Sequence, residues 1–420
     1  MRVRIKGNAR LSGNITVPAS KSLLHRAIIA SSLAEGKSII RNVSYSSDID
    51  ATIAGMEALG SKIIKHSNYL EIYGSSIKRI NNIIDANESG STLRFLIPIA
   101  MVIGDKITFT GRPGLSRRPL EPYFNIFKEK GIKYSYNNSP LPLEIENKLT
   151  SGVYNIRGDI SSQFITGLLF SLPLLEGDSI LNITAELESK GYIDLTLAIL
   201  KKFGIEIINN SYRSFIIRGG QKYKPTEYIC EGDYSQAAFY LCMNALGSNI
   251  NIANMNSNSY QGDMKILEDL RAMGSSYSFN NRVLANTMAI HNTSIALNNT
   301  PDLGPALAAL MSLTPGRGML INASRLRLKE SDRIASMEEE LSKLGIMVSS
   351  NADTLFISGS DRIAGGELWS HNDHRIAMAL SMLAIKSSGD IIINEAECVN
   401  KSYPGFWEAF KSLGGEVSYE

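Results

Sequence analysis

The sequence repeats one pattern six times, at intervals of about 70 residues. In each copy an amphipathic stretch of helical length ends at a glycine, and these glycines are Gly60, Gly131, Gly204, Gly274, Gly345 and Gly414. The intervals between them are 71, 73, 70, 71 and 69 residues. Glycine readily takes the left-handed conformation that closes a helix. A period this regular along 420 residues indicates one supersecondary unit used six times.

A second marker follows the same period. A small polar or charged cluster directly precedes an apolar run of helical length at Lys21-Ser22, Ser89-Gly90-Ser91, Ser161-Ser162-Gln163, Tyr234-Ser235-Gln236, Asp302-Leu303-Gly304 and Asp373-His374-Arg375. The free N–H groups and the positive dipole end of a helix N-terminus attract anions. Six such helix starts in one cleft would bind a heavily phosphorylated or carboxylated ligand.

The composition argues against several other functions. Lysine plus arginine number 43 against 41 aspartate plus glutamate, so no overall field attracts nucleic acid. Cys230, Cys242 and Cys398 have neither the spacing of a metal site nor that of a disulfide framework, which favours a reducing compartment. The N-terminus lacks the apolar region of a signal peptide, and no apolar run reaches membrane-spanning length. We therefore expect a cytoplasmic protein without nucleic-acid or membrane partners.

The local patterns predict an α/β fold with two helices and about four strands per repeat, in the order βαβαββ. The last repeat stops one strand after Gly414, and we expect the strands near the N-terminus to complete it. Three repeats per domain give a central domain at 20–228 and a second domain formed by 1–19 and 229–420. The alternative is an open solenoid scaffold. A different charged cluster at each helix start argues against that alternative.

The charged residues in these helix starts and their flanking loops are mostly basic. They comprise Lys21, Arg26, Arg94, Arg118, Lys329, Arg333, Arg375 and Lys401, against the carboxylates Asp302 and Glu330. Taken singly, each has an ordinary explanation as a helix cap or a surface ion pair. Ser161 and Ser162 open a buried helix with two hydroxyl groups, where one would suffice as a cap, and such an end suits a phosphate. Together these residues predict a cationic site with two isolated carboxylates.

The order of the motifs is more specific than any one of them. The series is P-x-S-K-S-x-x-x-R, S-G-S-T-x-R, R-R-P, S-S-Q-F, S-K-x-Y-I-D, L-K-E-S-D-R, N-D-H-R and K-S-Y-P, from about Val17 to Pro404. In this order the chain resembles the 5-enolpyruvylshikimate-3-phosphate synthase family of enolpyruvyl transferases. The resemblance implies a two-domain fold of six βαβαββ units, three per domain, with the active site in the interdomain cleft.

The resemblance also implies a reaction and its ligands. The enolpyruvyl group of phosphoenolpyruvate would pass to the 5-hydroxyl of shikimate 3-phosphate, releasing phosphate, with no cofactor and no metal. Shikimate 3-phosphate would be bound by Lys21, Ser22, Arg26, Ser161, Ser162, Gln163, Ser189, Tyr192, Asp302 and Lys329. Phosphoenolpyruvate would be bound by Lys21, Gly90, Arg118, Gln163, Arg333, Arg375 and Lys401. We expect a monomer.

The chemistry needs a base for the 5-hydroxyl proton and an acid for the methylene carbon of phosphoenolpyruvate. Asp302, Glu330 and Lys21 are the titratable candidates, and the cations around the carboxylates should keep them ionised. We assign Asp302 to the hydroxyl, and Glu330, alone or with Lys21, to the methylene carbon. Members of this family are targets of glyphosate. Glu88 stands where the family usually has asparagine, and we expect its charge to weaken phosphoenolpyruvate binding.

Two other functions remain open from the sequence. One is the related transferase that acts on UDP-N-acetylglucosamine, which usually carries a reactive cysteine in a loop of its N-terminal half. The corresponding stretch from Gly111 to Pro119 contains no cysteine. The other is an anion-binding or scaffold protein without catalytic activity on the same fold, which the presence of Asp302, Glu330 and Lys21 disfavours.

Overall fold

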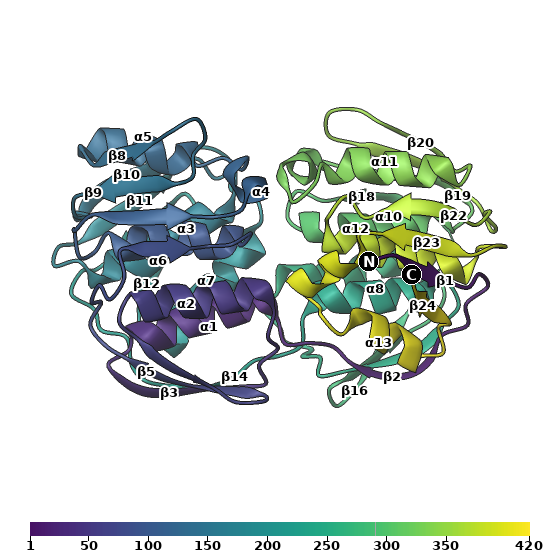
Figure 1. The fold of residues 1–420 in the computed structure, drawn as a ribbon, viewed down its shortest axis with the longest axis horizontal. Coiled ribbons are helices and arrows are strands. Elements are labelled where there is room, and N and C mark those ends of the chain that lie inside the picture. The colour runs from purple at the N-terminus through teal and green to yellow at the C-terminus, as the bar shows by residue number, and fades with distance from the viewer. Residues whose placement is uncertain (290) are drawn as a thin grey trace. The chain divides into compact units, whose positions relative to one another are not determined.

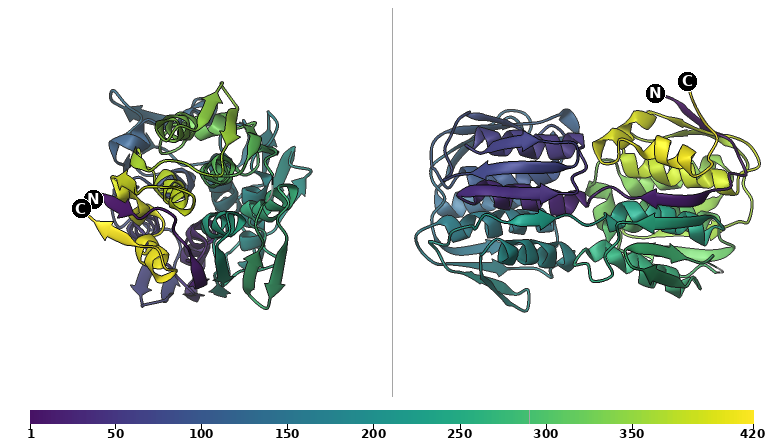
Figure 2. Two further views of the ribbon diagram at one scale, coloured as in Figure 1. Left: turned by 90° about the vertical axis from the view of Figure 1, so that its right-hand side faces the viewer. Right: turned by 90° about the horizontal axis from the view of Figure 1, so that it is seen from below.

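The computed structural model describes residues 1–289 and 291–420 and divides into two compact units. The terminal unit contains Met1–Pro18 and Glu231–Glu420, and the central unit contains Ala19–Cys230 (Figures 1 and 2). Each unit has its own buried apolar core. In the described part of the chain no helix could cross a bilayer, since even the longest, α1 (Lys21–Leu33) and α7 (Lys190–Lys202), have only 13 residues.

The central unit contains three repeats. The first has α1, β3 (Gly36–Arg41), α2 (Ser47–Ala58), β4 (Lys62–Lys65), β5 (Tyr69–Gly74) and β14 (Glu227–Ile229). The second has β6 (Ile83–Asp85), α3 (Gly90–Ala100), β7 (Ile107–Thr110), α4 (Pro113–Ser116), α5 (Glu121–Lys130), β8 (Lys133–Tyr136) and β9 (Leu143–Glu146). The third has β10 (Gly152–Ile156), α6 (Ser162–Ser171), the 3₁₀ helix η1 (Leu172–Leu174), β11 (Ser179–Ile183), α7, β12 (Ile207–Asn210) and β13 (Ser214–Ile217).

The terminal unit contains the other three repeats. The fourth has β2 (Ser12–Thr16), α8 (Tyr234–Ala245), β15 (Asn249–Ala253), η2 (Gly262–Lys265), α9 (Ile266–Ala272), β16 (Tyr277–Asn280) and β17 (Val283–Asn286). The fifth has β18 (Ser294–Ala296), η3 (Pro301–Leu303), α10 (Gly304–Ser312), β19 (Gly316–Ile321), η4 (Ser324–Leu328), α11 (Arg333–Lys343), β20 (Met347–Ser350) and β21 (Leu355–Gly359). The sixth has β22 (Gly366–Trp369), α12 (His374–Met382), η5 (Leu383–Ile385), β23 (Ile391–Asn394), η6 (Ala396–Lys401), α13 (Phe406–Ser412), β24 (Val417–Tyr419) and β1 (Val3–Ile5).

All six sheets have the same topology, which confirms the predicted α/β fold and its βαβαββ repeat. In each sheet an edge strand runs parallel to its neighbour, as β6 does to β7, and the two remaining strands are antiparallel, giving orders such as β6-β7-β9-β8. In the first and fourth repeats the parallel edge strand, β14 or β2, comes from a distant part of the chain. In the other four repeats the first helix connects the two parallel strands, as α3 connects β6 and β7. This is the crossover that parallel neighbours require.

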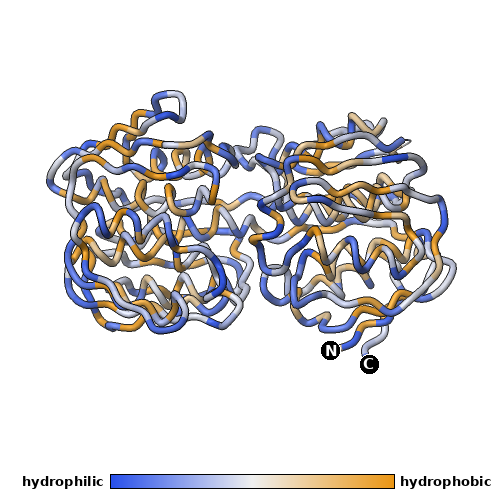
Figure 3. Tube along the Cα trace, turned by 90° about the horizontal axis from the view of Figure 1, so that it is seen from above, coloured by the Kyte–Doolittle hydropathy of each residue, from blue (hydrophilic) through white to orange (hydrophobic). Residues whose placement is uncertain are grey.

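The first helices of the repeats form the inside of each unit. Every residue of α8, α10 and α12 is buried, as is α3 apart from Ser91. Figure 1 shows α8, α10 and α12 in the interior of the terminal unit, whereas second helices such as α11 and α13 lie nearer its edge. β10 and β13 alternate between buried and more exposed side chains, as expected of strands with one face on a core. Hydrophilic and hydrophobic stretches likewise alternate along the trace in Figure 3.

The prediction for the N-terminal strands is half right. β1 pairs with both β23 and β24, and the two chain ends lie side by side in Figure 1, so β1 completes the sixth repeat as predicted. The prediction was wrong for β2, which runs parallel to β15 in the fourth repeat. That sheet needs a parallel edge strand before α8, but the strand nearest in sequence, β14, pairs with β3 in the central unit. The chain therefore passes between the units twice, once after β2 and once after β14. Each of these strands completes a sheet of the unit that the chain then leaves.

The periodic glycines close helices as predicted. Gly60, Gly131, Gly204, Gly274, Gly345 and Gly414 directly or almost directly follow α2, α5, α7, α9, α11 and α13, with φ between 66° and 104°. In this left-handed region an L-residue with a side chain is strained.

We expect Gly345→Ala to lower the free energy of unfolding by about 1 kcal/mol through backbone strain. Gly345 has φ +78°, and an added Cβ atom would meet nothing within 4 Å, so the loss would be conformational and not steric. Gly114→Ala is the matched control, because its surroundings are equally open and its φ is not positive. Thermal unfolding of both variants measures the difference in stability between them. Equal melting temperatures would show that position 345 does not require glycine.

Candidate active site

The start of α3 lies next to the segment between α4 and α5 and next to the first turn of α6. A Cβ atom at Gly90 would lie 3.0 Å from Arg118 Nη1 and 3.5 Å from Gln163 Oε1. Gln163, in the first turn of α6, accepts a hydrogen bond from Arg94 Nη1 at 2.7 Å and donates one to Ser91 Oγ at 2.9 Å. Three residues predicted to bind phosphoenolpyruvate, Gly90, Arg118 and Gln163, are therefore neighbours.

Arg26 links α1 to α7. Its Nε donates to Thr196 Oγ1 at 2.8 Å, Nη1 to the Ser22 carbonyl at 2.8 Å, and Nη2 to the Tyr192 carbonyl at 3.2 Å. Burial lowers the pKa of Arg26 to about 10, although Tyr192 opposes this shift. Three predicted ligands of shikimate 3-phosphate, Ser22, Arg26 and Tyr192, thus form one contact group.

Three serines lie on two adjoining loops. Ser161 caps α6 by accepting the Gln163 N–H at 3.3 Å, and Ser162 is the first residue of that helix. Ser189 precedes α7 with φ 57° and is fully buried. The Glu188 N–H donates to the Gly158 carbonyl at 3.3 Å, which joins the loop before α7 to the loop before α6. The predicted phosphate-binding serines therefore lie on loops that contact each other.

Lys21 opens α1 and forms an ion pair with Asp48 in the first turn of α2. The Lys21 Nζ to Asp48 Oδ2 distance is 2.8 Å, and the two side chains are 20% and 8% exposed. Lys21 can therefore be reached by a ligand while Asp48 holds its ammonium group in place.

Arg333 is the centre of the charged cluster in the terminal unit. Its side chain is 1% exposed and contacts three carboxylates: Nε lies 2.8 Å from Asp373 Oδ2, Nη1 2.9 Å from Asp302 Oδ1, and Nη2 2.7 Å from Glu330 Oε2. These carboxylates raise the pKa of Arg333 against the opposing effect of burial. The two carboxylates predicted to transfer protons are therefore fixed by one buried guanidinium.

Asp302 is surrounded by cations. Lys329 Nζ lies 3.0 Å and Arg333 Nη1 2.9 Å from its Oδ1, and Arg375 Nη2 lies 3.5 Å from its Oδ2. Burial alone would raise the pKa of Asp302, but these three cations hold it well below its usual range. Burial and the nearby Arg333 lower the pKa of Lys329, while Asp302 opposes this. The carboxylate proposed as the base is therefore ionised at neutral pH.

The remaining predicted residues of the terminal unit belong to the same cluster. Lys401 Nζ lies 3.6 Å from Glu330 Oε1, and Arg375 Nη2 donates to Ser235 Oγ at 2.9 Å. Gln236 Nε2 donates to Ser402 Oγ at 3.2 Å, which links α8 to the segment after Lys401. The three repeat starts of this unit thus meet, and they bring together Asp302, Lys329, Glu330, Arg333, Arg375 and Lys401.

Two carboxylates important to this arrangement were not predicted as ion-pair partners: Asp48 was not singled out from the sequence, and Asp373 was named only as part of a polar helix start. Asp48 stands in the first turn of α2, and Asp373 caps α12 by accepting the Arg375 N–H at 2.9 Å. Both positions are ordinary for a carboxylate near a helix start, so their sequence context indicates only capping. Asp48 pairs with Lys21, which opens α1, and Asp373 pairs with Arg333, which opens α11. These partners lie on other helices, so the local sequence does not indicate them.

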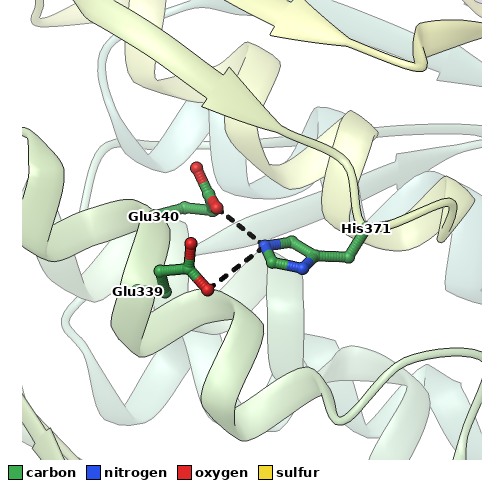
Figure 4. A group of neighbouring side chains, drawn as sticks. All are labelled: Glu339, Glu340 and His371. Atoms are coloured by element: carbon green, nitrogen blue, oxygen red, sulfur yellow. Dashed lines mark hydrogen bonds and ion pairs between the residues drawn. The ribbon is translucent and has the colours of Figure 1, made fainter.

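One group of possible metal ligands occurs among the residues described: Glu339, Glu340 and His371 (Figure 4). The two glutamates on α11 point towards His371, whose Nε2 lies 2.7 Å from Glu340 Oε1. The Lys343 ammonium lies 2.9 Å from Glu339 and 2.8 Å from Glu340. The hydrogen bond to Glu340 raises the pKa of His371 against the effect of burial. The cluster therefore already contains a cation, which disfavours a metal ion.

Comparison with known proteins identifies the family. The sequence profile of the family described as EPSP synthase (3-phosphoshikimate 1-carboxyvinyltransferase) matches residues 5–410. The chain belongs to this family. The 3-phosphoshikimate 1-carboxyvinyltransferase of Clostridium perfringens is 48% identical over 416 residues, 98% of each chain, and that of Clostridium acetobutylicum is 49% identical over 97% of this chain and 96% of its own.

Solved structures agree with this family. EPSP synthase from Acinetobacter baumannii superposes with a TM-score of 0.83 at 26% identity and full coverage of both chains. The enolpyruvyl transferase NikO from Streptomyces tendae gives a TM-score of 0.81 at 16% identity, covering 100% of this chain and 98% of its own, and at that identity shows the shared fold alone. The resemblance read from the motifs and the predicted enolpyruvyl-transferase fold are confirmed.

We expect Arg333→Met to lower the free energy of unfolding at pH 7 by roughly 3–5 kcal/mol, because three carboxylates lose their shared buried partner. The depressed pKa of Asp302 contributes stability above the unfolded pKa of about 3.9, and this contribution is lost as the pH falls. In the variant, protonation relieves the repulsion between the carboxylates. The deficit relative to the parent should therefore shrink most as the pH falls below about 4.

Arg327→Met is the matched control. Arg327 pairs with Asp332 at 2.7 Å in the same segment and donates to the Asn351 and Ala352 carbonyls, but the Arg327 and Asp332 side chains are 29% and 39% exposed. Replacing Arg327 should therefore cost less, about 1–2 kcal/mol. Denaturant unfolding at several pH values measures both variants. Equal deficits for the two variants would contradict a special role for Arg333.

Proposed function

We infer that the protein transfers the enolpyruvyl group of phosphoenolpyruvate to the 5-hydroxyl of shikimate 3-phosphate. Its family and its relatives of 48–49% identity support this reaction. The structural observation that carries it is the position of Asp302, a partly buried and ionised carboxylate among Lys329, Arg333 and Arg375. An addition–elimination between an alcohol and an anionic enol phosphate needs this combination of a base and anion-binding cations.

The reaction has two balanced steps. In the addition, the 5-hydroxyl oxygen bonds to C2 of phosphoenolpyruvate, the hydroxyl loses its proton, and the methylene carbon gains one. In the elimination, the resulting tetrahedral intermediate loses phosphate from C2 and a proton from the methyl carbon. The products are 5-enolpyruvylshikimate 3-phosphate and phosphate, formed in the shikimate pathway of aromatic amino-acid biosynthesis.

The residues proposed to bind each substrate belong to the groups of contacting side chains described above for the two units. For shikimate 3-phosphate, we propose that the hydroxyls of Ser161, Ser162 and Ser189 with Lys329 bind the phosphate. Arg26 and Ser22 bind the carboxylate, and Gln163 and Tyr192 line the ring. For phosphoenolpyruvate, the proposed ligands are Arg118, Gln163, Arg333, Arg375, Lys401 and the Gly90 backbone. Lys21 contacts both substrates. The burial and mutual contacts of these residues within each unit support the assignment.

Asp302 is the proposed base, and the low pKa of its carboxyl group makes it a weak base before substrate binds. The cations that lower this pKa, Lys329, Arg333 and Arg375, are themselves proposed anion ligands. Bound phosphate and carboxylate groups therefore compete with Asp302 for these cations. That competition raises the pKa of Asp302 towards the range in which it accepts the hydroxyl proton. Glu330, alone or with Lys21, donates the proton that the methylene carbon gains in the addition step.

We also propose that the central and terminal units are the two domains of the enzyme, and that it is a monomer in the cytoplasm. The separate apolar cores support the first statement. The three buried cysteines, none in a disulfide, support a reducing compartment.

We expect the purified protein to release phosphate from phosphoenolpyruvate with shikimate 3-phosphate and not with UDP-N-acetylglucosamine. A coupled assay for inorganic phosphate measures both reactions. Lys21→Ala should abolish the release, because Lys21 is proposed to contact both substrates. Release with the nucleotide sugar alone would overturn the substrate assignment, and release with neither would favour an anion-binding protein without catalytic activity.

We expect Asp302→Asn to lower kcat by roughly 10²- to 10⁴-fold, because the amide keeps the shape of the side chain but cannot accept the proton. Asp361→Asn is the control, since that carboxylate is 76% exposed and contacts only Lys386 among the ion pairs described. Steady-state kinetics at saturating substrates measure both variants. Near-parental turnover by Asp302→Asn would remove Asp302 as the base.

A further inference from the structure

A chain of four buried polar side chains runs beneath the starts of α1, α2 and α3 in the central unit. Its members are His25 on α1, Thr52 on α2, and Thr92 and Ser89 at the start of α3, and none is more than 1% exposed. His25 Nδ1 lies 2.7 Å from Thr52 Oγ1, which lies 2.6 Å from Thr92 Oγ1, and this atom lies 2.8 Å from Ser89 Oγ. Such short contacts between fully buried groups form one connected network.

The network needs all of its members. Each hydroxyl has one proton and can accept two hydrogen bonds, so each central threonine can bond to both of its neighbours in the chain. Replacing the Thr52 hydroxyl with a methyl group takes from the buried His25 Nδ1 its hydrogen bond to Thr52 Oγ1 and from Thr92 Oγ1 one of its partners. Losing the partner of a buried polar group costs more than the bond itself contributes.

His25 takes part as a neutral group. Burial lowers the pKa of His25 to about 3, an effect that Asp48 opposes and that the neighbouring Lys21 and Arg26 strengthen. The imidazole therefore stays uncharged across the physiological range and does not exchange protons with substrate. Its contribution is a fixed hydrogen bond between the helix that carries Lys21 and the rest of the network.

The network reaches proposed ligand-binding groups at its Ser89 end and, through Asp48, at its two central hydroxyls. Ser89 directly precedes Gly90 and caps α3 by accepting the Thr92 N–H at 3.2 Å. The backbone at Gly90 lies against Arg118 and Gln163. On the other side, the Asp48 carbonyl lies 3.4 Å from Thr92 Oγ1 and 3.5 Å from Thr52 Oγ1, and the Asp48 carboxylate pairs with Lys21 at 2.8 Å.

We propose that Thr52 is a positioning residue for phosphoenolpyruvate. Its hydroxyl joins His25 to Thr92 and so fixes the Gly90 backbone relative to the Lys21–Asp48 pair. This inference rests on the proposed function, in which Gly90 and Lys21 contact phosphoenolpyruvate. Thr52 itself touches no substrate, and its effect passes through the geometry of the two groups that do.

A second hydroxyl pair in the same unit provides a matched control. Thr166 Oγ1 on α6 lies 3.0 Å from Thr196 Oγ1 on α7, and both threonines are fully buried. Thr196 accepts from Arg26 Nε at 2.8 Å, so this pair supports the proposed carboxylate ligand of shikimate 3-phosphate. Thr52→Val and Thr166→Val thus remove the same group from equally buried sites that support different substrates.

The test compares the KM values of both substrates in the full-length enzyme. Thr52→Val should raise the KM for phosphoenolpyruvate about tenfold, which corresponds to about 1.4 kcal/mol, and change the KM for shikimate 3-phosphate less than threefold. Thr52→Ser, which keeps the hydroxyl, should restore the parental value. Thr166→Val should leave the KM for phosphoenolpyruvate near the parental value at a comparable loss of melting temperature.

The outcomes separate this inference from the proposed function. An inactive parent enzyme would refute the proposed function and the inference with it. An active parent in which Thr52→Val and Thr166→Val change both KM values alike would refute only the positioning role, as would a Thr52→Ser variant as impaired as Thr52→Val. If Thr52→Val fails to fold, Thr92→Val breaks the same chain one link nearer to Gly90 and gives the same readout.

Discussion

The structure depends on one constraint: the first helix of each repeat is almost entirely buried, so the polar groups at its start must find partners in neighbouring repeats. α12 shows how this is met. Asp373 accepts the Arg375 N–H of its own helix and also binds Arg333 at the start of α11. The Arg375 side chain in turn reaches Ser235 on α8 and Asp302 before α10. Burying the helices thus forces the charged starts of three repeats together, because an isolated buried charge is too costly.

This requirement explains how a folding constraint becomes a catalytic site. Arg333 stabilises three carboxylates that would otherwise repel one another, and the same contacts keep Asp302 ionised. In the central unit, the buried hydroxyls beneath α1, α2 and α3 satisfy one another while they orient Lys21 and Gly90 from below. In both units the groups proposed to meet substrate are rigid because their second partners are buried protein groups.

Several features could be predicted because they are local. The closing glycines and the six polar helix starts depend on residues adjacent in sequence, and all six glycines adopt positive φ. The strand order near the N-terminus could be predicted only in part. β1 completes the sixth repeat, where the sheet would otherwise lack a central strand, whereas β2 joins β15 because β14 is already paired with β3. Strand partners of this kind are chosen by which sheet edge remains unpaired, and that depends on the path of the whole chain.

The sequence by itself determined the repeat, the helix starts, the family and the identity of the charged residues, since periodicity, capping and motif order are properties of neighbouring positions. Only the tertiary structure decided which charges act together. Asp48 and Asp373 look like ordinary residues near helix starts until Lys21 and Arg333 reach them from other helices. Thr52 looks like a buried threonine of α2 until His25 and Thr92 approach within 2.7 Å. The physical reason is that hydrogen bonds and buried ion pairs act over about 3 Å, and proximity on that scale between residues distant in sequence exists only after folding.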